Sequence, residues 1–286
     1  MITPVSLIAS GILGIVLLMG YSVPSPGTEE RKILQKQAGS KAPEAFPLKP
    51  INGLEEAKEQ VDRFVRRIPK TGHKRALRLC QLARLYFFLG EEGDKKARKD
   101  NFKKGRYFAR LLLKEQPQRV EGHYWLALNL CGLANVAGAK NGLKLLPRIV
   151  ELLETNLSLD EAYDQAGPHR ILGRIYFMAP DWPLSVGDVS KSIRHLSSAV
   201  EISPENSTNH LYLAETLFFM GEERKAYQEL EKVLAATHHA LWLKGLDLDR
   251  QKARELMDKY EERKGIWRFF PWFWSSLTDM PGAKFA

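Results

Sequence analysis

From Leu54 onward, apolar residues recur every three or four positions, and polar residues fill the positions between them. This period is typical of amphipathic helices, and no stretch alternates strictly enough to predict a β-strand. We therefore predict an all-α fold with a helical body over residues 51–264. Before this body, residues 5–23 form a long apolar run, and residues 25–50 are rich in proline, glycine, serine and charged side chains.

The body contains an internal repeat, whose clearest copy spans residues 206–236. Seven positions of this copy match the spacing of a tetratricopeptide repeat (TPR): Leu213, Ala214, Leu217, Gly221, Ala226, Leu230 and Val233. The alanines let two helices cross closely, and the glycine ends the first helix in a tight turn. Looser copies predict helical pairs near 73–116, 119–158 and 168–203. Because one pair cannot bury its own apolar face, we expect the pairs to stack into a TPR-like solenoid.

Further segments are predicted at the two ends of the body. Residues 54–68 are typical of a leading helix, and residues 248–263 of a polar capping helix. Residues 265–286 form a tail in which six of the eight positions from 267 to 274 are aromatic, and Pro271 prevents one continuous helix. Three explanations stay open for these aromatic residues: packing into the solenoid, insertion at a membrane interface, or burial in a homo-oligomer.

The apolar N-terminal segment, residues 1–24, is about as long as a membrane-spanning helix requires and carries no charge. It predicts either an uncleaved membrane anchor or a cleaved signal peptide, and residues 25–50 predict a flexible linker. Basic side chains follow the segment and none precedes it. The positive-inside rule would therefore place the body in the cytoplasm.

The chain of 286 residues has an ordinary globular composition, with 44% hydrophobic and 27% charged residues, but its net charge of +9 is unevenly distributed. Residues 29–119 hold 24 Lys and Arg against 12 Asp and Glu, whereas the rest of the chain holds 19 against 22. The densest basic patch lies on one predicted helix: Lys95, Lys96, Arg98, Lys99, Lys103, Lys104 and Arg106. It is either a solvated helix face or a surface for anionic lipid head groups. Since few aromatic residues accompany it, we expect no nucleic-acid partner.

Residues that carry chemistry form no familiar catalytic or metal-binding motif. The two cysteines, Cys80 and Cys131, lie among apolar residues and predict buried thiols. The seven histidines show no metal-ligand spacing, and no phosphate-binding, dinucleotide-binding or serine-hydrolase motif occurs. We therefore expect a non-catalytic protein without a cofactor or a metal ion.

The segment Gly167-Pro168-His169-Arg170 is a candidate binding element, because proline suits the first turn of a helix. His169 and Arg170 would then lie at the positive end of that helix, where a carboxylate ligand is favoured. The alternative is that Arg170 pairs with a structural carboxylate such as Asp164, Asp181 or Asp188.

The segment from Asp181 to Asp188 predicts a rigid loop, since prolines fix the backbone on both sides of Trp182. Asp188 or Ser185 is a suitable N-cap for the helix that follows. Either the loop packs between helices, or Trp182 forms one wall of a concave groove.

These two segments resemble the T-component of TRAP transporters, a family of bacterial TPR-like proteins of tripartite, ATP-independent periplasmic transport. The resemblance covers about residues 120–236, and its specific pieces are Pro168-His169-Arg170 and Trp182-Pro183-x-Ser185-x-Gly187-Asp188. The family-like residues that we expect to contact a ligand or partner are Trp125, Asn129, His169, Arg170, Tyr176 and Trp182.

The resemblance implies a helical envelope protein, anchored at the bacterial inner membrane through residues 5–23, with its body in the periplasm. It implies that the concave groove binds a small organic ligand or a solute-binding protein, and that the chain is a possible homo-oligomer. The alternative, which the charge distribution favours, is a cytoplasm-facing, membrane-anchored TPR scaffold for protein–protein interaction.

Overall fold

The computed structural model describes residues 43–46, 49–237 and 245–269, with side chains through residue 262. Apart from one isolated bridge between Asp181 and Gly187, the regular structure of these residues is helical. The helices are α3 (Leu54–Arg66), α4 (Gly72–Glu92), α5 (Arg98–Glu115), α6 (Val120–Val136), α7 (Ala139–Leu143), α8 (Leu146–Asp160), α9 (Tyr163–Met178), α10 (Val189–Ile202), α11 (Ser207–Phe219), α12 (Glu223–Ala235) and α13 (Gly245–Phe269).

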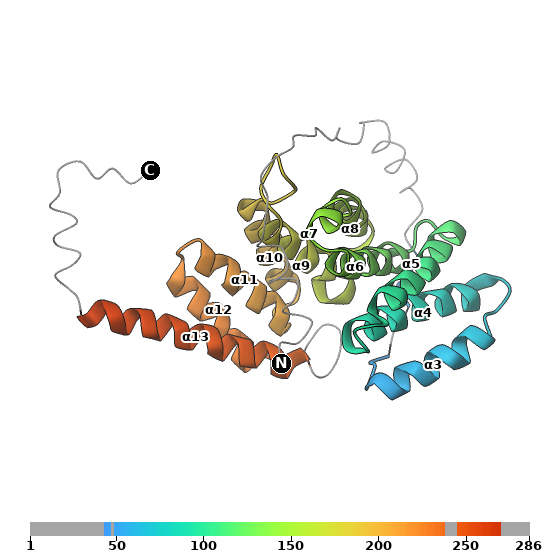
Figure 1. Cartoon of the computed structure of the whole chain (residues 1–286), viewed down its shortest axis with the longest axis horizontal. Coiled ribbons are helices and arrows are strands. Elements are labelled where there is room, and N and C mark those ends of the chain that lie inside the picture. The colour runs from blue at the N-terminus through green and yellow to red at the C-terminus, as the bar shows by residue number, and fades with distance from the viewer. Residues whose placement is uncertain (1–42, 47–48, 238–244, 270–286) are drawn as a thin grey trace.

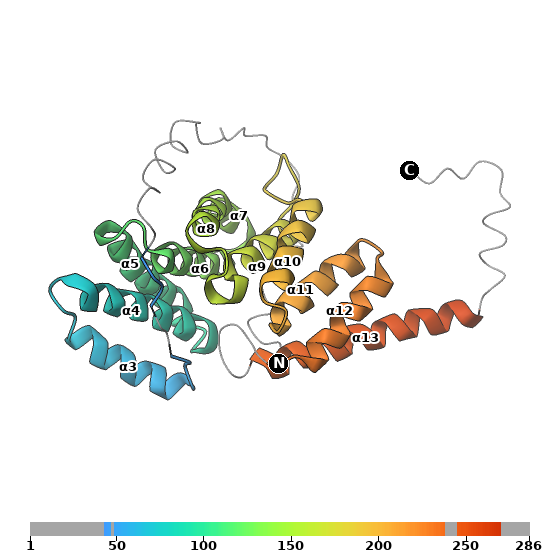
Figure 2. The same ribbon diagram turned by 180° about the vertical axis from the view of Figure 1, so that it is seen from behind.

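The long helices pack in the order in which they occur along the chain. Helix α4 pairs with α5, α6 with α8, α9 with α10 and α11 with α12, and each pair packs on the next. The pairs follow an arc that begins at α3 and ends at α13 (Figure 1), and the same succession is visible from behind (Figure 2). This arrangement confirms the all-α class and the stacking of helical pairs that the sequence predicts.

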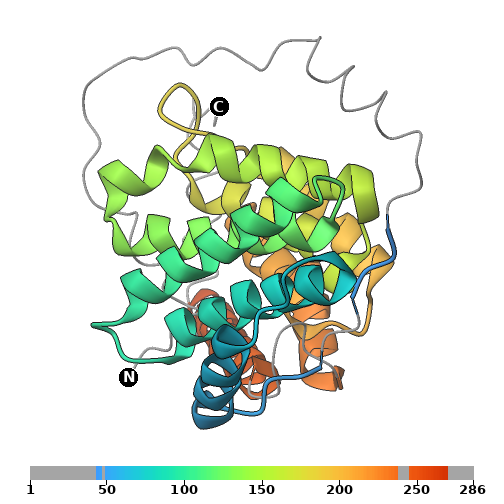
Figure 3. The same ribbon diagram turned by 90° about the vertical axis from the view of Figure 1, so that its right-hand side faces the viewer.

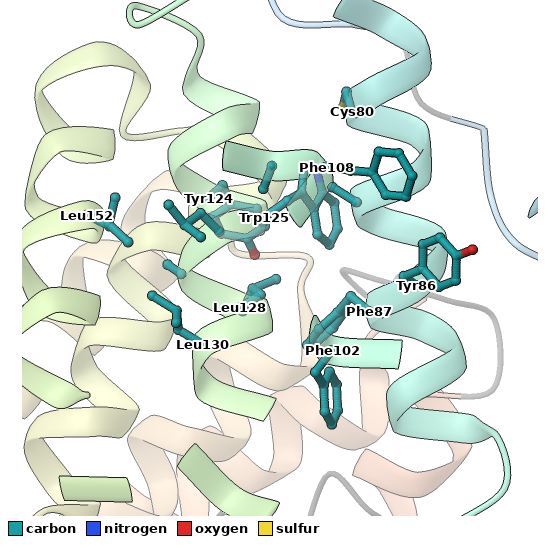
Figure 4. Packing of buried hydrophobic residues seen from close by; sticks show 14 of the residues in the cluster. Cys80, Tyr86, Phe87, Phe102, Phe108, Tyr124, Trp125, Leu128, Leu130 and Leu152 are labelled. Atoms are coloured by element: carbon teal, nitrogen blue, oxygen red, sulfur yellow. The ribbon is translucent and has the colours of Figure 1, made fainter. Parts of the chain in front are cut away.

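The buried apolar residues form two separate clusters. The first extends from Phe46 to Ala179 and is rich in aromatic rings contributed by α4, α5 and α6, several of which appear in Figure 4. The second extends from Leu196 to Ala253 and is mainly aliphatic. Within the described residues, the interior is therefore divided into two apolar clusters: the first ends on α9, and the second begins on α10 and α11.

The ring of Phe102 shows why the first cluster needs small residues at particular positions. Phe102 is fully buried on α5 and lies between Gly90 of α4 and Gly132 of α6. A Cβ atom at either glycine would overlap the ring. The two glycines therefore let three helices approach around one aromatic side chain.

The segment before α3 packs more closely than the sequence predicts. Residues 43–46 belong to the expected flexible linker, but the side chain of Phe46 is buried. The Phe46 N–H donates to Oε1 of buried Glu121 at 2.5 Å, and the Arg119 guanidinium lies 4.0 Å from the Phe46 ring centroid. Arg119 also donates to the carbonyl of Glu44 at 2.6 Å. Aromatic burial and these polar contacts attach the segment to the start of α6.

Two predicted segments cannot be compared with the structure. The apolar run at residues 5–23 lies outside the described residues, as does the aromatic cluster at 267–274 except for the backbone of 267–269. Within the described part of the chain, none of the helices combines the length and the apolar character needed to cross a membrane.

The contacts of Phe46 lead to a prediction about stability. Substitution Phe46→Ala should lower the free energy of unfolding by about 3 kcal/mol, because a buried aromatic side chain is lost. The matched control is Phe219→Ala, since Phe219 is 69% exposed and its loss should cost less than about 0.5 kcal/mol. Urea unfolding measures both, and equal midpoints for the two variants would contradict the packing of residues 43–46.

Candidate functional site

The segment that precedes the Pro-His-Arg motif has an unusual backbone. Asp164, Gln165 and Ala166 all lie in the left-handed region, with φ of 51°, 54° and 61°. For residues other than glycine this conformation costs about 1–2 kcal/mol each. Right-handed helix begins after residue 166, so Pro168 falls in the first turn, where no intrahelical donor is lost.

The guanidinium of Arg170 is bonded to this left-handed turn. It is 2% exposed, and it donates to the carbonyl of Gln165 at 3.0 Å and to Oδ2 of Asp164 at 2.9 Å. The hydroxyl of Tyr124, on α6, donates to the same Asp164 oxygen at 2.5 Å. Of the alternatives considered for Arg170, the structure therefore shows pairing with Asp164.

The charges in this group are strongly coupled. Burial alone would lower the pKa of Arg170, but Tyr124 and Asp164 beside it raise that pKa, so the guanidinium stays charged. Burial raises the pKa of Asp164, although Arg170 and the Tyr124 hydroxyl act in the opposite direction. A buried ion pair of this kind is stable only when further hydrogen bonds satisfy both partners.

Side chains at the start of α11 and at its N-cap complete the network from the other side. Nη1 of Arg170 donates to Oδ1 of Asn209 at 3.2 Å, and Nδ2 of Asn209 donates to the carbonyl of Gln165 at 3.3 Å. Asn206 donates to the side chain of Gln165 at 2.6 Å. A buried polar junction thus connects α6, α9 and α11.

Gly167 owes its place in the motif to Tyr124, because a Cβ atom at residue 167 would overlap the Tyr124 hydroxyl. One turn after Arg170 along α9, Arg174 donates to Oε2 of Glu215 on α11 at 2.5 Å and lies over the ring of Tyr212. The Gly-Pro-His-Arg segment and the turn after it therefore serve the packing between helical pairs.

His169 and Tyr176, two further candidates, meet at His195 of α10. The Nδ1 atoms of His169 and His195 are within hydrogen-bond distance of each other, at 3.0 Å, and Tyr176 stacks on the His195 ring. Burial, followed by repulsion from His169, lowers the pKa of His195 to about 4. At neutral pH the His195 imidazole is therefore uncharged.

The candidates Trp125 and Asn129 lie on α6, inside the first apolar cluster. Nε1 of Trp125 donates to the hydroxyl of Tyr163 at 3.2 Å. Nδ2 of Asn129 donates to the carbonyls of Ala83 at 3.2 Å and Trp125 at 2.7 Å, which links α6 to α4. Both side chains are fully enclosed by neighbouring helices.

Trp182 differs from the other candidates, since its side chain is 84% exposed. The loop that carries it projects from the helices between α9 and α10 (Figure 1). The base of the loop is fixed by the N–H of Gly187, which donates to the Pro180 carbonyl, and by that of Asp188, which donates to the Tyr176 carbonyl, both at 2.9 Å. Asp188 also caps α10 by accepting from the Lys191 N–H at 2.8 Å, as the sequence predicts.

Other exposed apolar side chains lie on this loop and at the end of α11, which packs beside the end of α9. Leu184 is on the loop itself, and Phe219 and Met220 stand at the end of α11, which contacts α9. Phe219 packs edge-on against Phe177, two residues before the loop begins, at 5.5 Å between ring centroids. We call Trp182, Leu184, Phe219 and Met220 the apolar edge.

The predicted basic patch lies on the turn before α5 and on the first half of that helix. Lys95, Lys96, Lys99, Lys103 and Lys104 are exposed, whereas Arg98 and Arg106 are half-buried. Arg98 turns inward, donates to the carbonyl of Gly90 at 2.9 Å and lies 3.7 Å from buried Glu91. Arg98 therefore belongs to the helix interface more than to the surface.

Of the six predicted ligand residues, five are buried and mutually separated into three groups, and only Trp182 is open to solvent. That a ligand contacts them stays a prediction. Sequence reasoning did not identify Tyr124 or Asn209 as members of the Arg170 network, although both lie in stretches noted as family-like.

Among the described residues, no three His, Cys, Asp or Glu side chains lie close enough to hold a metal ion.

The stacked helical pairs define a TPR-like scaffold, and the comparisons identify its family. The chain matches the family described as TRAP transporter T-component over residues 53–263, and it belongs to that family. None of the curated proteins compared with it is significantly similar. Among solved structures, it is similar to a thermophilic TPR protein of Thermus thermophilus, with 20% identity and a TM-score of 0.44, over 63% of this chain and 85% of that one.

The lowered pKa of His195 predicts a pH-dependent stability. Between its ordinary pKa of 6.5 and about 4, the unfolded chain binds a proton at His195 that the folded chain does not. His195 therefore lowers the free energy of unfolding as the pH falls through that window. Substitution His195→Gln keeps a polar partner for His169 but removes the titration.

Thermal unfolding of both proteins at several pH values measures the effect. The melting temperature of the wild type relative to the variant should fall between pH 7 and pH 5 and stay constant above pH 7. A constant difference across the whole range would contradict the assignment.

Proposed function

We propose that this chain is a non-catalytic binding scaffold of TRAP-type transport, working in the bacterial cell envelope with its body in the periplasm. Membership of the T-component family supports a role in transport, and stacked helical pairs are a frame on which proteins present binding surfaces. The proposed partner is an exported solute-binding protein, bound at the surface of the scaffold.

The apolar edge is the observation that carries this proposal. Large apolar side chains that stay exposed mark interaction sites on soluble surfaces, and tryptophan is frequent among the residues that dominate binding energy. Trp182 is presented on a loop whose base is hydrogen-bonded to α9, so little order has to be gained when a partner binds.

Binding of a small organic ligand by the buried candidates receives less support. Trp125, Asn129, His169, Arg170 and Tyr176 already use their polar groups or rings within the protein. A ligand would have to displace these contacts before it could reach the side chains.

The apolar edge predicts a specific mutational effect. The double substitution Trp182→Ala and Phe219→Ala should weaken binding of the purified solute-binding protein at least about tenfold, as expected when an anchoring aromatic residue is lost. The helicity and the melting temperature should not change, since both side chains are exposed. The matched control is Tyr107→Ala, which removes an exposed aromatic residue of α5. Equal affinities of the two variants would count against the edge.

Cross-linking in living cells tests partner and compartment together. A photo-activated amino acid at position 182 should capture an exported solute-binding protein of a TRAP system, whereas the same group at exposed Glu231 of α12 should not. Capture of a cytoplasmic protein at position 182, or equal capture at both positions, would overturn the proposal and favour the cytoplasm-facing scaffold.

A further inference from the structure

Helix α5 carries a continuous basic stripe on its outer side. The stripe consists of six side chains, each three or four positions along the helix from at least one other member: Lys99, Lys103, Arg106, Tyr107, Arg110 and Lys114. This spacing places them on one side of the helix, while the opposite side buries Phe102, Gly105, Ala109 and Leu112 against α4 and α6. We call these six residues the α5 stripe.

The α5 stripe is open to solvent along its whole length. Its lysines and Arg110 are exposed, Arg106 is half-buried, and Tyr107 is 58% exposed. Figure 3 looks onto this end of the molecule, where α5 crosses the side that faces the viewer. Lys95 and Lys96, in the turn before α5, extend the positive charge beyond the start of the helix.

Carboxylates neutralise little of this charge. Helix α5 has seven basic residues and two acidic ones. Asp100 pairs with Lys103 at 3.1 Å, and Glu115 pairs with Arg75 of α4 at 2.8 Å. For Lys99, Arg106, Arg110 and Lys114, no carboxylate of the described residues lies within ion-pair distance. The stripe therefore keeps a strong local positive potential.

A helix face that is only solvated does not require such an excess of basic over acidic residues, as α12 shows. Helix α12 is the second helix of the last pair, as α5 is of the first, and it has three basic and three acidic residues. Two of its lysines, Lys225 and Lys232, are paired with glutamates one turn away, at 3.1 and 2.7 Å. The charge of α5 thus differs from that of an equivalent helix in the same chain.

We propose that the α5 stripe is a docking surface for an anionic lipid bilayer. A bilayer offers a flat array of negative groups, which matches a stripe about four helical turns long. Tyr107 combines an apolar ring with a polar hydroxyl, as residues at lipid interfaces commonly do. The stripe has no aliphatic side chain that could insert, so the contact is electrostatic and is weakened by salt.

A nucleic acid fits these observations less well. Proteins that bind single strands combine basic grooves with several aromatic side chains on which bases stack, whereas the α5 stripe has one aromatic residue. Membership of a transporter family also places a membrane near this protein. The inference does not depend on the apolar edge or on the partner proposed for it.

The test uses the full chain, so that the apolar sequence of residues 5–23 is present in every sample. It measures whether α5 itself contacts the bilayer. A fluorophore is attached to the variant Tyr107→Cys, and vesicles carry a quencher on their head groups. The matched label is attached to Glu231→Cys on α12. Labelling of the unsubstituted chain gives the background from Cys80 and Cys131.

The label at position 107 should be quenched by phosphatidylcholine vesicles that contain phosphatidylglycerol, and hardly by phosphatidylcholine alone. High salt should abolish the quenching, and the label at position 231 should respond to neither lipid. Each Lys or Arg near an anionic surface contributes about fivefold to partitioning. The triple variant Lys99→Glu, Arg110→Glu and Lys114→Glu should therefore reduce the contact at least about tenfold.

The control variant carries Arg224→Glu, Lys225→Glu and Arg254→Glu, which change the net charge equally at exposed positions of α12 and α13. In this control variant, the label at position 107 should still be quenched by the anionic vesicles. If the stripe variant loses helicity, two further measurements decide the question. They are the quenching of the variant with glutamine at the same three positions, and the salt dependence of the quenching of the wild type.

Three results would overturn the proposal. The first is equal quenching at position 107 by neutral and anionic vesicles. The second is an equal loss in the stripe variant and the control variant. The third is preferential binding to a nucleic-acid duplex when it competes with anionic vesicles, which would assign the stripe to nucleic acid.

Discussion

The buried guanidinium of Arg170 is the group on which the arrangement of the two halves of this protein depends. The apolar interior of the described residues is divided into two clusters, and polar side chains of α9 and α11 bond to one another between them. Arg170 bonds simultaneously to the left-handed turn before it, to Asp164 and to Asn209 of α11. Removal of one partner from such a buried pair typically costs about 3–5 kcal/mol, because the other charge is left unpaired.

The left-handed turn and the guanidinium require each other. Three consecutive non-glycine residues keep this strained backbone only where surrounding contacts compensate for it. Here the carbonyl of Gln165 accepts from Arg170 and Asn209, and Tyr124 donates to Asp164. The Pro-His-Arg motif is thus a determinant of architecture at the junction between helical pairs.

In this arrangement, the residues that hold the scaffold together are distinct from those that it exposes on its surface. The motif residues are inside, whereas the apolar edge and the α5 stripe lie on the surface, on the later and the first helical pairs respectively. In our proposal one surface meets a protein and the other a bilayer, as expected of a scaffold in a transport system.

The helices and their stacking could be predicted because they follow from apolar periodicity, which is local in the sequence. The Arg170 network could not, because its members lie some 40 residues apart along the chain: Tyr124, Arg170 and Asn209 meet only after the pairs have stacked. The burial of Phe46 was missed for the same reason, since the acceptor of its N–H is Glu121, 75 residues away. The loop before α10 was predicted as rigid from its prolines, but whether Trp182 faces inward or outward depends on tertiary packing.

Hydrogen exchange of the Arg170→Met variant, measured helix by helix in the full chain, tests most directly whether this guanidinium couples the two clusters. The amides of α11 and of the start of α9 should lose protection by roughly a hundredfold, while those of α4 and α5 should keep theirs. Unchanged protection of α11, or an equal loss in all helices, would show that the polar junction does not hold the two halves together.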